Sequence, residues 1–295
     1  MAIHFIKDLP EIIENTLASD LTLVADSGGT KTDWCLISNE SAFIIETVSL
    51  HPNHLPSISE IAFIQFLKQL ASKKNITLHF FGAGCLQPNN QEIIRNYFAS
   101  IPFKFIHIQS DLIGAGKALL GNGSGLIGIM GTGSVLCHFD GNTITKLIGG
   151  FGYILGDEGS GYYFGKLVIQ YYLSNKCSEA LRELIENTLG SREEILAKVY
   201  SSEGKKFISS ILLLTENNSI QEEINTIHKQ NINLFLDSYL PKESHNKSIS
   251  FIGSYAHFQE NILQELISQH GWKLEKCMQK PIIPLTENII HRKIS

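Results

Sequence analysis

Short apolar runs alternate along this chain with amphipathic segments of helical period. Residues 21–26 form the first strong apolar run and predict a buried strand, whereas the apolar spacing over 58–71 marks one face of a helix. Alternation of strands and helices is typical of α/β proteins. The further strands that we predict lie at 33–38, 42–49, 77–81, 103–108, 126–130, 134–139, 143–148 and 248–252. The further helices lie at 91–100, 112–120 and 162–174, with a last one after Ser254 that ends near His270.

The order of these elements repeats. A three-strand meander over 21–50 opens the first series, and a second series begins at a helix over 112–120. We therefore predict two α/β domains, residues 1–110 and 111–295. The first has a helical or partly ordered extension over 1–20, and the tail 281–295 could pack back on it. The second carries a helical insertion over 178–240, with helices near 178–189, 191–200, 204–215 and 218–240.

Two turns rich in glycine and hydroxyl groups interrupt the strands. Such turns can point backbone N–H groups and hydroxyls at a phosphate, and glycine allows positive φ and close approach. Two of them suggest a duplicated unit whose halves close on a nucleotide from either side. Their residues are Gly28, Gly29, Thr30 and Lys31 in the first, and Gly131, Thr132, Gly133 and Ser134 in the second.

Two aspartates follow predicted strands. Asp26 could hold Mg²⁺ beside bound phosphates or cap its own turn, and the presence of the second turn favours the metal. Asp111 could take the proton of a substrate hydroxyl or cap the helix after it. Thr30 is a candidate phosphate donor, while Lys31 could reach phosphate or face solvent.

Two further glycine-containing segments carry candidate ligand contacts. Asp157 and Glu158 lie in the segment 149–161, where their carboxylates could bond sugar hydroxyls or stabilise the start of the next helix. Gly253 and Ser254 join a strand to a helix, which would suit either a purine or a plain tight connection.

Composition excludes several classes. With 43% hydrophobic and 18% charged residues, the chain is typical of a soluble globular protein, and its net charge of −5 gives no support to a nucleic-acid role. No apolar run approaches the roughly 20 residues of a membrane span, and the first residues lack a secretory signal pattern. Five scattered cysteines predict reduced thiols in a cytoplasmic protein.

Together these segments resemble the BadF/BadG/BcrA/BcrD-type ATPase family, in the sugar-kinase branch of the actin-like ATPases, which includes N-acetylglucosamine kinases. Segment 26–32 is similar to its first phosphate motif, 131–134 to the second, 150–160 to its Gly-Asp-Glu-Gly-Ser signature and 253–256 to its adenosine motif. The extension over 1–20 is not part of this pattern.

The resemblance implies two ribonuclease H-like domains with a nucleotide cleft between them, ATP and Mg²⁺ as cofactors, and a homodimer. It implies that Asp111 is the catalytic base. The residues that it implies for sugar contact are Asn53, Asp111, Thr132, Gly150 and Asp157.

The expected activity is ATP-dependent phosphorylation of an N-acetylated amino sugar, N-acetylglucosamine or N-acetylmuramate. One alternative is an ATPase coupled to a partner protein for electron transfer, but the scattered cysteines disfavour the iron–sulfur cluster that it needs. A non-enzymatic regulator would need a DNA-binding segment, for which residues 1–20 are too short.

Overall fold

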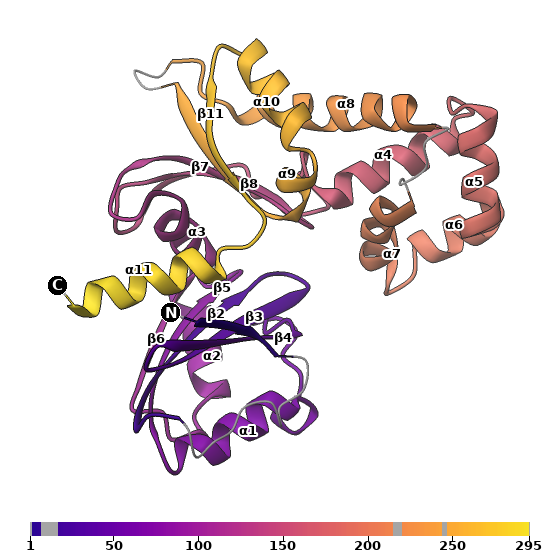
Figure 1. Cartoon of the computed structure of the whole chain (residues 1–295). Helices are drawn as coiled ribbons and strands as arrows, with labels where there is room; N and C mark the ends of the chain where they lie inside the picture. The colour runs from indigo at the N-terminus through magenta and orange to yellow at the C-terminus, as the bar shows by residue number, and fades with distance from the viewer. Residues whose placement is uncertain (1, 7–16, 215–219, 244–246, 295) are drawn as a thin grey trace. The chain divides into compact units, whose positions relative to one another are not determined.

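The computed structural model describes residues 2–6, 17–214, 220–243 and 247–294. Its contacts divide the chain into two compact units. Unit 1 comprises Met1–Ser124, Phe139–Ile144 and Lys280–Ser295, and unit 2 comprises Gly125–His138 and Thr145–Gln279. Each unit contains one β-sheet with helices, coloured along the chain in Figure 1.

Unit 1 is built on a six-stranded sheet with the order β1-β4-β3-β2-β5-β6. Strands β2, β3 and β4 form an antiparallel meander, β5 and β6 continue it parallel to β2, and β1 adds parallel to β4. The strands are β1 (Ala2–Phe5), β2 (Asp20–Ser27), β3 (Lys31–Ser38), β4 (Ser41–Val48), β5 (Asn75–Gly82) and β6 (Phe105–Ser110).

Helices cover both faces of this sheet (Figure 1). Helices α1 (Ala62–Ala71) and α2 (Pro88–Tyr97) pack on one face, and a 3₁₀ turn (Ile58–Glu60) precedes α1. Helices α3 (Asp111–Leu120) and α11 (Ile282–Ile294) pack on the other face and against each other. Trp34, fully buried on β3, contacts Phe63 and Phe98 edge-on, which ties the sheet to α1 and α2.

Unit 2 has a five-stranded sheet with the order β11-β10-β7-β8-β9. Its strands are β7 (Gly125–Met130), β8 (Ser134–Phe139), β9 (Ile144–Ile148), β10 (Ser248–Ile252) and β11 (Lys273–Met278). As in unit 1, three consecutive strands are followed by two that add parallel to the first of them. The predicted fold class, two ribonuclease H-like domains of the actin-like ATPase kind, is confirmed.

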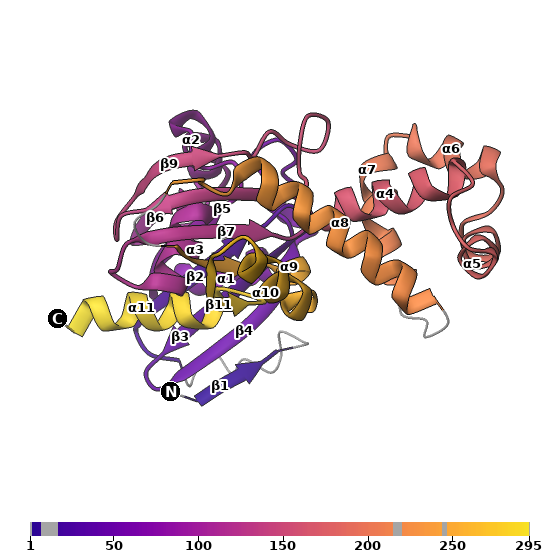
Figure 2. The same cartoon turned by 90° about the horizontal axis from the view of Figure 1, so that it is seen from above.

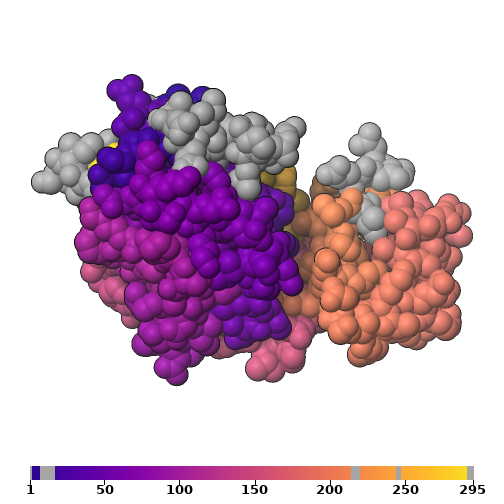
Figure 3. All heavy atoms as spheres, turned by 90° about the horizontal axis from the view of Figure 1, so that it is seen from below, coloured from indigo at the N-terminus to yellow at the C-terminus, as the bar shows by residue number. Residues whose placement is uncertain are grey.

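The other helices of unit 2 are α4 (Gly161–Leu173), α5 (Glu179–Leu189), α6 (Arg192–Val199), α7 (Gly204–Ser210), α8 (Gln221–Tyr239), α9 (Ser254–Phe258) and α10 (Glu260–Gln269), with a 3₁₀ helix at Ile211–Leu214. Helices α5 to α8 lie within the range 178–240 that was predicted as a helical insertion. In Figure 3 the salmon and orange atoms of α5, α6, α7 and α8 lie next to one another.

The N-terminal segment differs from its prediction. Residues 2–5 form a strand, not a helix, because their backbone pairs with the edge of β4, as Figure 2 shows. Ala2 donates to the carbonyl of Glu40 at 2.7 Å, and Ile6 donates to that of Ile44 at 2.9 Å. The strand is exposed, so no burial pattern signalled it. The rest of the predicted extension, except Ile6 and residues 17–20, lies outside the described part of the chain.

Three other differences concern long-range packing. The boundary expected near residue 110 lies instead after Ser124, because α3 packs on β5, β6 and α11 within unit 1. Strand β11, which the sequence did not reveal, is a mostly polar edge strand. The single helix expected after Ser254 is broken at Gln259. The tail residues from Lys280 onward belong to unit 1.

Among the described helices, none is long and apolar enough to cross a membrane.

Candidate active site

The central feature of unit 1 is a pair of aspartates at one edge of the sheet. Strands β2, β5 and β6 are parallel neighbours, so their carboxyl ends meet at this edge. Asp26 lies near the end of β2, and Asp111 follows β6 directly. Between them β5 ends at Gly82, which pairs with Ser27 on one side and Ser110 on the other. The carboxyl group of Asp111 therefore lies near enough to Asp26 for its charge to act on it.

Asp26 has a strongly perturbed carboxyl group. Its pKa is raised to about 8, first by burial and then by the negative charges of Asp111 and Asp33, against the opposing charge of Lys280. Asp33 is the cross-strand partner of Asp26 on β3. A carboxyl group that is costly to ionise beside other carboxylates is suited to a cation that would neutralise it.

Asp111 is held at the first position of α3. Its Oδ1 accepts hydrogen bonds from the Ser110 hydroxyl and the Leu112 N–H, both at 2.9 Å. The helix cap that was considered for Asp111 is in fact Ser110, whose hydroxyl also accepts from Leu112. Burial raises the pKa of Asp111, and the two hydrogen bonds partly offset this. The carboxyl group is therefore fixed in orientation and has an increased affinity for a proton.

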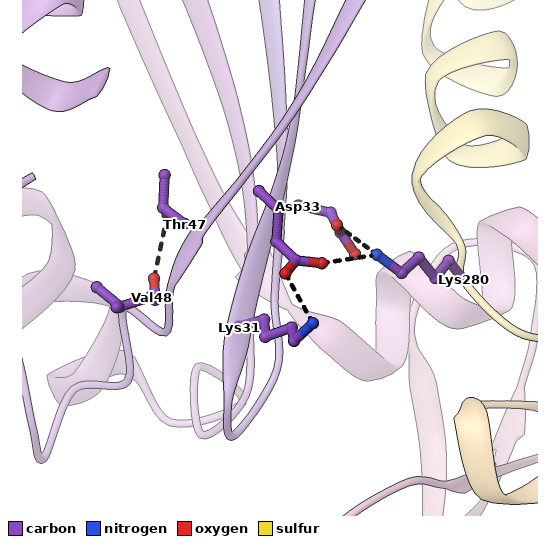
Figure 4. A network of polar contacts seen from close by, with 6 residues as sticks. Lys31, Asp33, Thr47, Val48 and Lys280 are labelled. Carbon is purple, nitrogen blue, oxygen red and sulfur yellow. Dashed lines mark hydrogen bonds and ion pairs between the residues drawn. The ribbon is translucent and has the colours of Figure 1, made fainter. Parts of the chain in front are cut away.

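Lys280 neutralises part of this acidic edge. Its ammonium contacts Asp33 at 2.8 Å and Glu46 at 3.0 Å (Figure 4). Lys31 pairs with the other oxygen of the Glu46 carboxylate at 2.7 Å, so the side chain that was predicted to reach phosphate or face solvent is half-exposed in an ion pair. Asp33 and Lys280 were not singled out from the sequence, because their role depends on strand register and on the return of the chain to unit 1.

Hydrogen bonds hold the backbone of the first turn, and the space beside Gly29 is free of described atoms. Gly28 donates to the Lys31 carbonyl at 3.0 Å, and the hydroxyls of Ser27 and Thr32 both accept from Leu50. Contrary to expectation, neither glycine of this turn has positive φ. A Cβ added to Gly29 would meet no described atom within 4 Å. Since neither conformation nor packing requires glycine at that position, its backbone is left accessible to a ligand.

The second turn, in unit 2, is fixed by Asp157. The Ser134 N–H donates to Asp157 Oδ1 at 3.2 Å, and the Ser134 hydroxyl donates to the Glu158 carbonyl at 2.5 Å. A Cβ on Gly133 would lie 3.1 Å from the same carboxylate, whereas one on Gly131 would meet no described atom within 4 Å. Burial raises the pKa of Asp157, and φ at this residue is +66°. Thr132, half-buried, accepts from Tyr162 through its carbonyl.

The predicted adenosine turn lies beside the second phosphate turn. Strands β7 and β10 are parallel neighbours and end there together. Gly253, at φ +124°, donates to the Met278 carbonyl, and a Cβ on it would lie 2.3 Å from the Met130 carbonyl. Ser254 begins α9. The Gly161 N–H donates to the Gly131 carbonyl at 2.9 Å, so the signature segment ends at the same place.

A buried polar network that the sequence did not reveal supports this region. The Asn231 side chain on α8, fully buried, accepts from the Gly159 N–H at 2.8 Å and donates to the Ser160 carbonyl at 2.9 Å and the Tyr255 hydroxyl at 2.8 Å. His228 joins the network through the Tyr255 hydroxyl, and burial lowers its pKa to about 3. The amide thus links the signature segment to the helix after Gly253.

The two remaining predicted sugar contacts lie in loops. Gly150 has φ +71° and lies against Val135, and after it the side chains of Phe151, Ile154 and Leu155 are exposed. Asn53 is exposed in the turn between His51 and His54, in unit 1. That turn lies near Gly84, where an added Cβ would be 3.3 Å from the His51 ring. The structure gives Asn53 no described contact with Asp111.

A divalent cation here would have to be held largely by water molecules and substrate phosphates, and only in part by protein side chains. Among the described residues, no group of three or more His, Cys, Asp or Glu side chains could hold a metal ion. Mg²⁺ usually keeps several waters and is bound through one or two carboxylates and substrate phosphates. The half-buried Asp26 fits that mode, because the surrounding carboxylates disfavour its ionisation without a counter-charge.

The fold has counterparts of known structure. A structure from Porphyromonas gingivalis described as a "putative N-acetylglucosamine kinase" is 25% identical, covers 92% of this chain and 99% of its own, and superposes with a TM-score of 0.83. This chain has its fold. The family resemblance predicted from the motifs is confirmed to that extent.

A second such structure, a "putative N-acetylglucosamine kinase" from Chromobacterium violaceum, is 17% identical with a TM-score of 0.67 and covers 91% of this chain and 98% of its own. It shows the same fold. No protein-family model matches this chain, and no curated protein matches it.

Proposed function

We propose that this protein is an ATP-dependent kinase that phosphorylates a hydroxyl group of an N-acetylated amino sugar, N-acetylglucosamine or N-acetylmuramate. The observation that carries the proposal is the pair of interacting carboxyl groups, Asp26 and Asp111, at one edge of the sheet. Over 92% of its length the chain has the fold of a structure described as a "putative N-acetylglucosamine kinase". A site that transfers phosphate to a hydroxyl needs a proton acceptor and a counter-charge for phosphate.

Asp111 takes the proton of the attacking sugar hydroxyl. Its Oδ1 is occupied by the Ser110 and Leu112 donors, which hold the carboxyl group in one orientation. Burial raises its pKa, so its basicity is greater than that of a carboxylate in water. The hydroxyl oxygen then bonds to the γ-phosphorus as the bond to the ADP oxygen breaks.

Asp26 and the two turns bind the nucleotide. Mg²⁺, when bound through Asp26, would offset the charge of the phosphates. The open backbone at Gly29 and Gly131 supports phosphate binding by Gly28, Gly29, Thr30 and Lys31 and by Gly131, Thr132, Gly133 and Ser134. Gly253 and Ser254 would receive the adenosine.

The sugar is assigned to Asn53, Asp111, Thr132, Gly150 and Asp157 on the strength of the family motifs. Asp157 combines this role with the support of the second turn. The exposed apolar side chains after Gly150 would cover the apolar face of a sugar ring. We also propose a homodimer on the strength of the family resemblance. The molar mass of the protein in solution would test this oligomeric state.

Cysteine positions bear on the alternative, an ATPase coupled to a partner protein. The thiols of Cys35, Cys85 and Cys137 are buried, and burial raises the pKa of Cys35 to about 11 and that of Cys85 to about 12. Neutral buried thiols are poor cluster ligands. No observation favours this alternative over the kinase.

ADP release tests the proposal. The purified protein would be assayed with Mg-ATP across hexoses and N-acetylated amino sugars, with a reaction lacking sugar as the control. We expect release that depends on an N-acetylated amino sugar. Equal release without sugar would indicate a partner-coupled ATPase, and dependence on an unmodified hexose alone would overturn the amino-sugar assignment.

A further inference from the structure

Unit 1 contains a cavity that is separate from the candidate active site. It has a volume of about 470 Å³ and lies among β5, β6, α3 and α11, with one side chain from α2 at its rim. Neither Asp26 nor Asp111 lines it. Its size falls within the range of small-molecule sites, and nothing in the proposed kinase reaction uses it.

Basic and imidazole groups converge on this cavity. His79 on β5 and His107 on β6 are cross-strand partners, so both side chains lie on one face, with ring centroids 4.8 Å apart. Lys117 comes from α3, and Arg95 from α2 donates to the Ile106 carbonyl at 3.4 Å and pairs with Glu92 at 3.5 Å. None of the described residues that line the cavity is acidic. Such a lining favours an anion.

Two polar groups are already buried in the wall. Lys117 is only 9% exposed, and its ammonium donates to Gln109 Oε1 at 2.7 Å and lies 5.4 Å from the centre of the Phe81 ring. The Oδ1 atom of Asn288, on α11, is buried and has no hydrogen-bond partner in the described part of the structure. An unsatisfied buried acceptor is costly, and a ligand that donates a hydrogen bond would remove that cost.

We propose that this cavity binds a small phosphate ester. A phosphate dianion matches the two cations and the paired imidazoles better than a single carboxylate does. A hydroxyl or amine elsewhere on the same ligand would donate to Asn288. The volume of about 470 Å³ is that of a site for a small metabolite. The inference goes beyond the proposed function and does not rest on it.

Imidazole NMR signals report on this site directly. The protein would be titrated with glycerol 3-phosphate, inorganic phosphate and glycerol, with His79 and His107 assigned through His79→Gln and His107→Gln. We expect saturable shifts of both signals with glycerol 3-phosphate, weaker binding of inorganic phosphate and no effect of glycerol. The absence of a saturable shift would overturn the proposal.

Substitutions in the cavity distinguish the residues that bind the phosphate group from the residue that binds the rest of the ligand. Lys117→Gln and the more exposed Arg95→Gln should each weaken glycerol 3-phosphate at least about tenfold, a loss typical of one charged contact. Asn288→Ala should weaken the ester but leave inorganic phosphate unchanged. The control is Lys104→Gln, which removes a surface lysine paired with Asp20 and should change neither. Unchanged affinity in both the Lys117 and Arg95 variants would refute the site, and Arg95→Gln keeps the test valid if Lys117→Gln does not fold.

Discussion

The carboxylate of Asp111 raises the pKa of Asp26, although the two residues end different strands. The effect is possible because the carboxyl ends of the parallel strands β2, β5 and β6 meet at one edge of the sheet. Between the two aspartates β5 ends at Gly82, where packing requires glycine, since a Cβ would lie 2.5 Å from the Phe80 ring and 3.0 Å from the Cys85 sulfur. The edge of the sheet therefore concentrates negative charge where the proposed reaction needs a cation and a base.

Asp26→Asn should stabilise the metal-free protein while abolishing activity. The folded pKa is about 8 and the ordinary value is 3.8, so between these values the folded state binds the extra proton and wild-type stability falls as pH rises. The gain in Tm should therefore be larger at pH 8 than at pH 5, with about 2–4 °C for each kcal/mol. Thermal melts of this variant and of Asp20→Asn, an exposed position on the same strand, check this. An equal gain at both pH values would contradict it.

Lys280→Met should destabilise unit 1 more than Lys31→Met does. Both lysines contact Glu46, but only Lys280 also contacts Asp33, which is mostly buried. We expect a loss of about 1 kcal/mol for Lys280→Met after allowance for its partial exposure, and less for Lys31→Met. Urea unfolding at pH 8 measures both. Equal losses would show that the Asp33 contact contributes nothing.

Asp157→Ala should weaken MgADP binding about tenfold or more, whereas Asp157→Asn should remain within about threefold. Alanine removes the acceptor for the Ser134 N–H and tolerates the positive φ poorly, while asparagine keeps both. Calorimetric titration with MgADP in the absence of sugar measures the effect of Asp157 on the second turn without any contribution from a sugar contact. If alanine and asparagine weakened MgADP alike, the carboxylate charge and not the turn would be the cause.

Asn231→Leu should cost about 3 kcal/mol or more of unfolding free energy, because it leaves three buried polar groups without the amide that they bond. Gln221→Leu, at an exposed position on the same helix, is the control and should change little. Denaturant unfolding of both variants gives the difference. A loss no greater than that of the control would mean that water replaces the amide.

The sequence sufficed for features that depend on local pattern. Asp26 and Asp111 stood out because each lies at the end of a predicted strand, and the alternating elements indicated the repeated fold. Asp33 and Lys280 did not, since one acts through strand register and the other through the return of the chain to unit 1. Strand β11 was hidden because an edge strand with Lys and Glu side chains lacks an apolar alternation.

The most direct test compares wild type with Asp111→Asn. Formation of the sugar phosphate from Mg-ATP and N-acetylglucosamine would be measured by mass spectrometry, N-acetylmuramate would be assayed in parallel, and MgADP affinity would be measured on the same samples. Our account predicts product from wild type with at least one of the two sugars, at least about a thousandfold slower turnover in the variant, and nearly unchanged nucleotide affinity. A variant that turns over at a rate near wild type would contradict the assignment of Asp111 as the base.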